Sequence, residues 1–198
     1  MFLLISLLKA FFIKDKAKFL EKIDEANFSI YEYRGIRIVD TLNNRVIRNL
    51  IIIAIDRIPN DVLSIVKKRL NLIRIERKDS DVFRKNSGGF FAYTDDVIYV
   101  KKRYIGIIDA VLHEMGHAFD YSISKSNIST IPYSVCTDFK ERLSVKDYNC
   151  IKNNFGKYFI SNIQEVFAEM FANNFRKSVV KTTTKNIKIV MNSIIYGI

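Results

Sequence analysis

Apolar and polar positions along the first 77 residues follow strand and helix periods in turn. Residues 31–40 and 72–77 alternate between apolar and polar side chains, which predicts two half-buried strands. Between them, residues 43–56 repeat apolar positions at three- and four-residue steps, which predicts a helix. A second helix is predicted over residues 60–70, with Asn60 placed to cap it. The front of the chain therefore predicts strand, helix, helix and strand.

A further pair of strands is predicted just before the middle of the chain. Gly89, Phe90, Phe91 and Ala92 are followed by a polar turn and then by the apolar residues 97–100. If the first of these strands lies at the edge of a sheet, its unpaired backbone groups can hold an extended peptide. These four residues are therefore candidate substrate-binding residues, and the alternative is a hairpin with a purely structural role.

Helical periods dominate the back half of the chain. Residues 105–123 predict an amphipathic helix, and residues 187–195 predict a closing helix. Ser161 and Gln164 have the Ser-x-x-Gln form of a capping box, so a third helix is predicted to start near Asn162. The intervening stretch is mixed and polar.

The composition is that of one globular domain. Of the 198 residues, 48% are apolar and 27% charged, and two prolines with seven glycines leave no obvious linker. We expect a single α+β domain over residues 1–198. A small sheet lies in a front lobe (residues 31–123), and a helical back lobe follows (residues 124–198).

Two interpretations of residues 1–30 stay open. The stretch from Met1 to Ile13 is almost entirely apolar but shorter than the ~20 residues of a membrane-spanning helix. One interpretation is an amphipathic helix that continues through Phe19, Leu20 and Ile23. The other is a weak export signal, although a basic leader and a cleavage site of small residues are lacking.

Positive charge is concentrated in the front half. The chain has a formal net charge of +11, and residues 1–103 carry a surplus of 8 positive charges. Basic clusters at residues 67–69 and 101–103 either attract anionic partners or form a solvated face. No nucleic-acid-binding signature accompanies them, so we expect no nucleic-acid partner.

The two cysteines leave the compartment open. Cys136 and Cys150 lack the CxxC spacing of a cysteine metal site. They form either one disulfide in an exported protein or two free thiols.

The residues with the clearest chemistry are the two histidines. His113 and His117 are the only histidines in the chain, and they stand four residues apart within the pattern HExxH. On a helix both imidazoles project from one face and can share a zinc ion. Glu114 is then placed to act as a general base on a water that zinc activates. The alternative is a chance occurrence of the pattern on an ordinary helix.

A second pair of candidates lies on the helix predicted to start near Asn162. Glu165 and Glu169 stand one turn apart beside its apolar stripe, where a carboxylate is costly unless it is paired or bound to metal. They are the best candidates for a third metal ligand and its support. The alternative is two surface glutamates.

Two segments of the chain resemble one family of metalloproteases. HEMGHAFDY, which starts at His113, and YFISNIQEVFAEMF, which starts at Tyr158, resemble the anthrax lethal factor catalytic domain and the secreted clostridial Pro-Pro endopeptidases. The shared features are the alanine and aspartate after the second histidine and a tyrosine seven residues before a glutamate. The Gly-Gly-aromatic run before the helix is similar to the active-site edge strand of that family. The likeness covers about residues 58–175.

The resemblance implies a role for each matching residue. His113, His117 and Glu165 correspond to the zinc ligands and Glu114 to the base. Tyr158 corresponds to the donor that stabilises the transition state, and Glu169 to a carboxylate that supports a ligand histidine. Lethal factor is a large multidomain toxin, and the Pro-Pro enzymes have a clear signal peptide that residues 1–13 do not match, so the resemblance transfers the substrate of neither relative.

The function predicted from the sequence is that of a zinc-dependent metalloendopeptidase of the zincin type. Its partner is a peptide or protein substrate, its cofactor is Zn²⁺, and we expect a monomer without a transmembrane segment. The resemblance implies a secreted, toxin-like protease. The alternative is a catalytically inactive, basic binding or toxin-accessory protein with the same fold.

Overall fold

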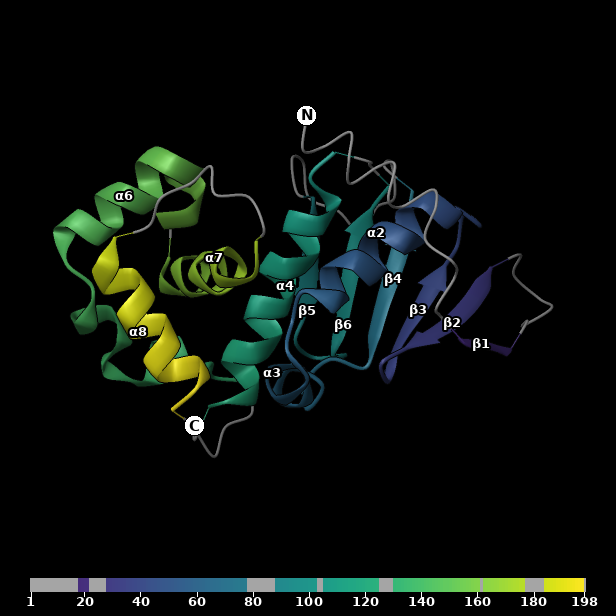
Figure 1. Cartoon of the computed structure of the whole chain (residues 1–198), viewed down its shortest axis with the longest axis horizontal. Coiled ribbons are helices and arrows are strands. Elements are labelled where there is room, and N and C mark those ends of the chain that lie inside the picture. The colour runs from purple at the N-terminus through teal and green to yellow at the C-terminus, as the bar shows by residue number, and fades with distance from the viewer. Residues whose placement is uncertain are drawn as a thin grey trace.

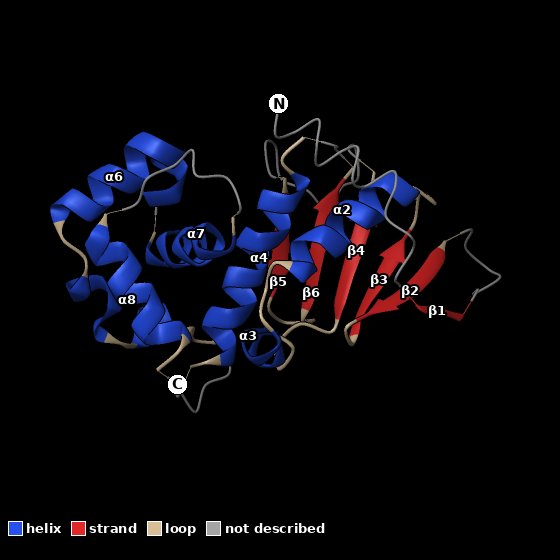
Figure 2. Ribbon diagram, viewed as in Figure 1, coloured by secondary structure: helices blue, strands red, loops and turns tan. Residues whose placement is uncertain are grey.

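The structure, a computed structural model, describes residues 18–21, 28–77, 88–102, 105–124, 130–160, 162–176 and 184–197. Within these ranges the chain has an α+β architecture, as the sequence predicted, with a mixed sheet and helices (Figure 1). Figure 2 shows the strands gathered on one side and α6, α7 and α8 on the other, with α4 between them.

The sheet has six strands in the order β1-β2-β3-β4-β6-β5. The strands β3, β4 and β6 are parallel, whereas β1, β2 and β5 pair antiparallel with their neighbours. Their bounds are β1 (Lys18–Glu21), β2 (Ser29–Tyr33), β3 (Ile36–Asp40), β4 (Leu72–Glu76), β5 (Gly89–Ala92) and β6 (Val97–Lys101).

The helices of the front part cover the sheet. They are α2 (Arg45–Asp56), α3 (Asn60–Val66) and the longer α4 (Ile107–Ser122). The back part contains α5 (Tyr133–Cys136), η1 (Asp138–Arg142), α6 (Val145–Phe155), η2 (Lys157–Ile160), α7 (Ile163–Phe175) and α8 (Lys185–Ile195). The helix predicted over residues 105–123 corresponds to α4, and the closing helix corresponds to α8.

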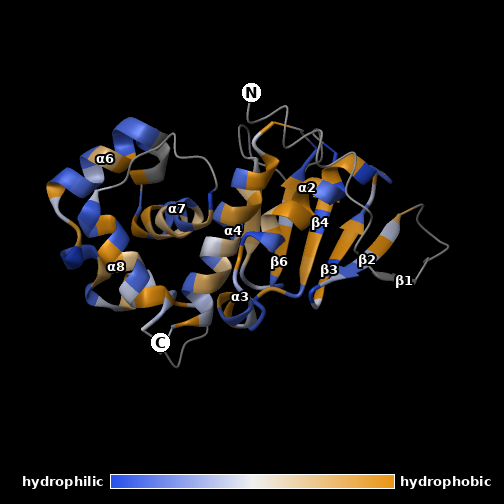
Figure 3. Cartoon of the chain, in the orientation of Figure 1, coloured by the Kyte–Doolittle hydropathy of each residue, from blue (hydrophilic) through white to orange (hydrophobic). Residues whose placement is uncertain are grey.

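The helix α4 connects the two parts of the molecule. It packs against α2, α3, β5 and β6 on one side and against α5 and α7 on the other. Its buried apolar residues join the same core as those of the sheet and of α7, and burial of such side chains is the main driving force for folding. Figure 3 shows the apolar residues along β3, β4 and β6, whereas the surface of α6 is mostly hydrophilic.

The single strand predicted over residues 31–40 is two strands joined by a tight turn. Arg34 and Gly35 have φ angles of 50° and 77°, and two consecutive positive φ values are those of a type I′ hairpin turn. Arginine rarely adopts this conformation. Here its guanidinium donates hydrogen bonds to the carbonyls of Ile55 (2.8 Å) and Ile58 (3.0 Å), near the end of α2. These contacts join Arg34 to residues more than 20 positions away, so the sequence around the turn does not predict it.

The second helix is shorter than predicted, and Asn60 does not cap it. Pro59 occupies the N-cap position, and the Asn60 side chain accepts a hydrogen bond from Arg34 instead. The helix ends at Val66 rather than Leu70, because the backbone of Asn71 must pair with Arg37 and with Asp96 at the start of β4. Sheet pairing therefore overrides the helical pattern of the last four residues.

Two further predictions are corrected near the termini of elements. Residues 18–21 form β1, so a helix does not continue through Phe19 and Leu20. Residues 1–17 lie outside the described ranges, as does Ile23. The N-cap of α7 is Asn162 rather than Ser161, and its side chain accepts from the N–H of Glu165.

Two remaining observations concern the membrane and the cysteines. None of the described helices combines the length and the apolar character that crossing a bilayer requires. Cys136 is exposed and Cys150 is partly buried, and the two are not joined by a disulfide.

Candidate metal centre

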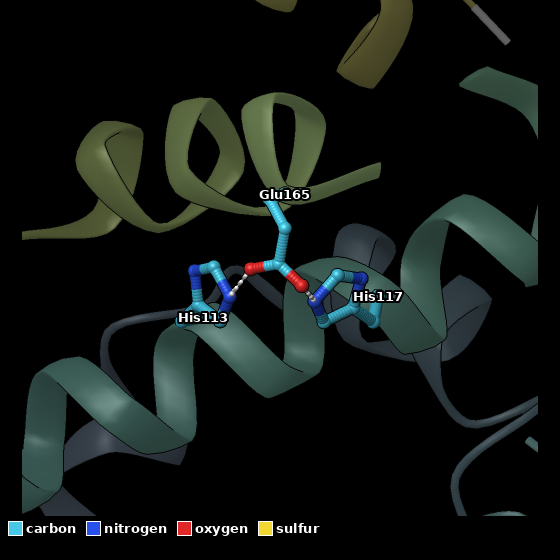
Figure 4. A group of neighbouring side chains, drawn as sticks. All are labelled: His113, His117 and Glu165. Carbon is cyan, nitrogen blue, oxygen red and sulfur yellow. Dashed lines mark hydrogen bonds and ion pairs between the residues drawn. The ribbon is translucent and has the colours of Figure 1, made fainter. Parts of the chain in front are cut away.

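His113, His117 and Glu165 come together where α4 and α7 pack. Their ligand atoms all lie within 4.8 Å of one another. The Nε2 atom of His113 lies 3.1 Å from Oε2 of Glu165, and Nε2 of His117 lies 3.6 Å from Oε1 (Figure 4). Ligand atoms of a tetrahedral zinc ion with bonds of ~2 Å are ~3.3 Å apart. The two distances, one to each oxygen of Glu165, lie close to this value, so the three side chains are near enough to share one metal ion.

The local sequence of α7 places Glu165 at this point. Asn162 caps the helix, and its side-chain oxygen accepts from the N–H of Glu165 at 2.9 Å. Glu165 therefore lies in the first turn of α7, where a negative side chain is favoured by the helix dipole. The cap fixes the start of the helix and hence the position of the carboxylate.

A close approach of backbones brings the two helices together. A Cβ added to Gly116 would lie 2.8 Å from both Cα and O of Ala168. Only glycine permits this distance, and Gly116 lies between the histidines while Ala168 is one turn after Glu165. The residue inside the HExxH pattern therefore sets how near α7 comes to the metal-binding face of α4.

Hydrogen bonds within the site shift the pKa values of His113 and Glu165. Burial alone lowers the pKa of His113, but hydrogen bonds to Glu165 and Glu169 outweigh burial and raise that pKa to about 10. Burial likewise raises the pKa of Glu165, and its hydrogen bonds to both histidines outweigh this and lower it. Hydrogen bonds to His113 and Arg176 also outweigh burial and lower the pKa of Glu169, so both glutamates stay negative.

Glu169 contacts the other nitrogen of His113. Its Oε2 lies 3.3 Å from Nδ1 of His113, and the Glu169 side chain is 1% exposed. A carboxylate in this position accepts the Nδ1 proton, which leaves Nε2 free to bind a metal. The geometry fits the supporting role that the sequence predicted for Glu169.

Glu114 is buried beside the edge strand. The residue is 8% exposed, and burial raises its pKa while the two histidines lower it. The backbone N–H of Phe91 hydrogen-bonds to its carboxylate, and a Cβ added to Gly89 would lie 3.6 Å from its Cγ. A carboxylate with a raised pKa that is held by β5 is suited to exchange a proton with a nearby group.

The strand β5 lies at the edge of the sheet, at least among the described residues. The N–H of Lys101 donates to the carbonyl of Gly88 at 3.0 Å. Hydrogen-bonded positions alternate along an antiparallel pair, so the backbone groups of Phe90 and Ala92 are the ones that hydrogen-bond to β6. Gly89 and Phe91 therefore direct their backbone groups away from β6. Phe91 packs beside Tyr121 of α4 with ring centroids 5.9 Å apart.

Two of the predicted substrate-binding residues differ in their surroundings. The ring of Phe90 stacks on Tyr99 with centroids 4.8 Å apart, on the other face of the strand from Phe91. The N–H of Phe91 is already used by Glu114. Substrate binding by residues 89–92 stays a prediction, and the outward backbone groups of Gly89 also lie beside Glu114.

Tyr158 lies in η2, which packs against α7 near the end that carries Glu165. Its side chain lies outside the described part of the structure. The role predicted for Tyr158 stays a prediction.

Three residues around the site were not singled out from the sequence, and these are Gly116, Asp109 and Arg176. Asp109 stands one turn before His113, a spacing that could have indicated a shared helix face. Arg176 comes one residue after the apolar stripe of α7. A basic side chain at this position is normally explained by its favourable interaction with the helix dipole. No local signal links Arg176 to the histidines.

Comparison of the chain with protein-family models, with curated proteins and with solved structures finds no match. The functional argument therefore depends on the geometry of the site.

Proposed function

We propose that this chain is a zinc-dependent metalloendopeptidase of the zincin type. The observation that carries the proposal is the meeting of His113, His117 and Glu165 within 4.8 Å, with the buried carboxylate of Glu114 beside them. A chance HExxH pattern does not require a glutamate of a different helix beside both histidines. The resemblance of two segments to the lethal factor and Pro-Pro endopeptidase family points the same way.

His113, His117 and Glu165 would hold the zinc ion. When bound, zinc supplies a Lewis acid that polarises a carbonyl and lowers the pKa of a water towards ~7. Because these three residues leave one position of a tetrahedron for water or substrate, their number fits a catalytic rather than a structural site.

Glu114 would take the proton of the attacking water and pass it to the leaving amine. Its burial favours the protonated form, while the two neighbouring histidines favour the carboxylate. A group with these opposing influences can both accept and release a proton during one reaction. The Tyr158 hydroxyl would donate a hydrogen bond to the oxyanion that develops on the peptide carbonyl.

The edge strand β5 would hold the peptide backbone. The strand lies directly beside Glu114, so a peptide that pairs with Gly89 passes the proposed metal. An extended substrate that adds to a sheet edge uses backbone hydrogen bonds, which are independent of side-chain identity.

One experiment with matched variants tests this function. The protein is loaded with zinc, its metal content is measured, and cleavage of a peptide library is followed. Glu114→Gln should retain zinc and lose ~10²–10⁴-fold in kcat, the usual contribution of a general base. Glu165→Ala should lose zinc, and Tyr158→Phe should keep zinc while kcat falls ~10-fold or more.

Glu141→Gln is the control, because Glu141 is an exposed glutamate in η1. It should match the wild type in both measurements. Comparable cleavage by Glu114→Gln would exclude the proposed base, and wild-type turnover by Tyr158→Phe would exclude the oxyanion donor. A wild-type protein that binds no zinc but binds an anionic polymer in a salt-sensitive manner would favour the inactive basic binding protein.

A further inference from the structure

Arg176 is a partly buried arginine that joins the C-terminal end of α7 to α4 near the proposed metal centre. Its side chain is 10% exposed. Its Nη1 donates to Oε1 of Glu169, and its Nη2 donates to Oε2 at 3.2 Å. Its Nε donates to Oδ1 of Asp109, also at 3.2 Å. The guanidinium therefore hydrogen-bonds to both oxygens of Glu169 and also to Asp109.

These contacts continue to a metal ligand. Oε2 of Glu169 receives Nη2 of Arg176 and also lies 3.3 Å from Nδ1 of His113. Asp109 and His113 lie one turn apart on α4, and both of their partners lie on α7 or at its end. The two helices are thus joined by two polar contacts spaced one turn apart, which restrains their relative position along the helix axis.

The charge of Glu169 depends on a cation in this environment. A carboxylate with 1% exposure is strongly disfavoured in its charged form unless a cation pairs with it. A bidentate guanidinium is the best such partner, because both of its N–H groups match the two oxygens. Arg176 is such a partner, because its guanidinium contacts both oxygens of Glu169.

The tautomer of His113 depends on the position of the Glu169 carboxylate. A charged Glu169 accepts the Nδ1 proton, so in the neutral imidazole Nε2 is the nitrogen available to a metal shared with Glu165. A displaced Glu169 would no longer select this tautomer, and the ring could also present Nδ1 without its proton. The orientation of the imidazole would then be less restricted.

We propose that Arg176, held by Asp109, is a positioning residue for the metal site: it keeps Glu169 in place as the acceptor that fixes the tautomer of His113. This inference rests on the proposed metal site but not on peptide hydrolysis. The Asp109 side chain is 56% exposed, so solvent screens its contact and its loss has a smaller effect than the loss of Arg176.

The test measures zinc affinity by competition with a chelator and the tautomer of His113 by NMR. Loss of a group that supports a metal-ligating histidine typically weakens metal binding ~10–100-fold. We expect a loss in this range for Arg176→Met and less than ~10-fold for Asp109→Asn. Arg176→Lys keeps the charge but not the bidentate geometry, so it should restore part of the affinity. Arg142→Met is the matched control, because Arg142 bonds to Ser193 on the surface.

The NMR readout separates positioning from a general loss of stability. The chain has only two histidines, so nitrogen-15 labelling of histidine gives the ring signals of His113 and His117 alone. In zinc-loaded wild-type protein, Nδ1 of His113 should carry a proton in slow exchange with water. In Arg176→Met this exchange should speed up at saturating zinc, with Arg176→Lys between the two.

Unchanged zinc affinity and unchanged ring signals in Arg176→Met would overturn the inference and leave the proposed function intact. A fall in thermal stability with unchanged ring signals would also overturn it, because Arg176 would then have only a structural role. If Arg176→Met does not fold, Arg176→Lys and Asp109→Asn decide by the same criteria. Wild-type protein that binds no zinc would overturn both proposals, whereas zinc binding without hydrolysis would overturn the peptidase alone.

Discussion

Gly116 shows how a residue without a side chain can control a site. It lies between the two histidines in a helix, where glycine costs ~1 kcal/mol relative to alanine. Helix propensity therefore favours an alanine at this position. The opposing contact is with the backbone of Ala168, at 2.8 Å from an added Cβ. A backbone atom in a packed helix cannot move aside as the end of a flexible side chain can. The contact therefore outweighs helix propensity and makes alanine destabilising at position 116.

We predict that Gly116→Ala destabilises the protein by ~1–3 kcal/mol, the usual cost of overpacking a core. The same substitution should weaken zinc binding, because displacement of Ala168 moves Glu165 away from the histidines. Urea unfolding of the metal-free protein and a zinc titration measure the two effects. A variant that is more stable by the propensity gain, with unchanged zinc affinity, would show that the helices do not meet as closely as described.

At the scale of elements, Asp147 joins the starts of two helices in the back part. It accepts from the N–H (2.8 Å) and the hydroxyl (2.7 Å) of Ser144, which completes a capping box on α6. It also accepts from the hydroxyl of Thr184 and from Asn186 Nδ2 (2.7 Å) at the start of α8. Burial raises the pKa of Asp147, but these hydrogen bonds outweigh burial and lower it.

This lowered pKa predicts a specific pH dependence of stability. A carboxyl group with a folded pKa below its unfolded value of ~3.9 contributes stability above that pH, and the contribution is lost as the pH falls through the folded pKa. Asp147→Asn should therefore cost ~1.5–3 kcal/mol at pH 7, the range for hydrogen bonds to a charged group. The difference from wild type should hold down to about pH 5 and shrink below about pH 4.

Urea unfolding at a series of pH values, followed by circular dichroism, measures this difference. Asp138→Asn provides the matched control, because Asp138 is exposed in η1. A difference between wild type and Asp147→Asn that stays constant to pH 3 would show that the charge of Asp147 is not what stabilises the two helices.

At the scale of the whole molecule, the proposed ligands come from two packed parts of the chain. His113 and His117 lie on α4, which packs on the sheet with α2, whereas Glu165 lies on α7 among the back helices. A metal that binds all three links these parts only in the folded state. Binding to the folded state alone stabilises a protein in proportion to the logarithm of the ligand concentration.

We predict that zinc at about 100 times its Kd stabilises the protein by ~2.7 kcal/mol. For a chain of this size that corresponds to a rise in Tm of about 5–10 °C. A chelator should reverse the rise, and Glu165→Ala should abolish most of it. Thermal unfolding with zinc and with chelator measures the effect. An equal rise in Glu165→Ala would place the bound zinc elsewhere.

The sequence by itself was sufficient for features that depend on neighbours within a few residues. Periodicity located α2, α4, α7 and α8 to within a few residues, because the same face of a helix must be apolar wherever it meets the core. Spacing alone put His113 and His117 on one face of α4. Glu165 could be proposed because a carboxylate beside an apolar stripe needs a partner.

Tertiary structure decided the features that depend on residues far apart in the chain. The turn at Arg34 depends on carbonyls more than 20 residues away, and α3 ends early because β4 must pair on both sides. The contact of Gly116 with Ala168 and the link from Asp109 through Arg176 to Glu169 join α4 to the region of α7. No local pattern encodes such contacts, because the energy that selects them arises only when the chain has packed.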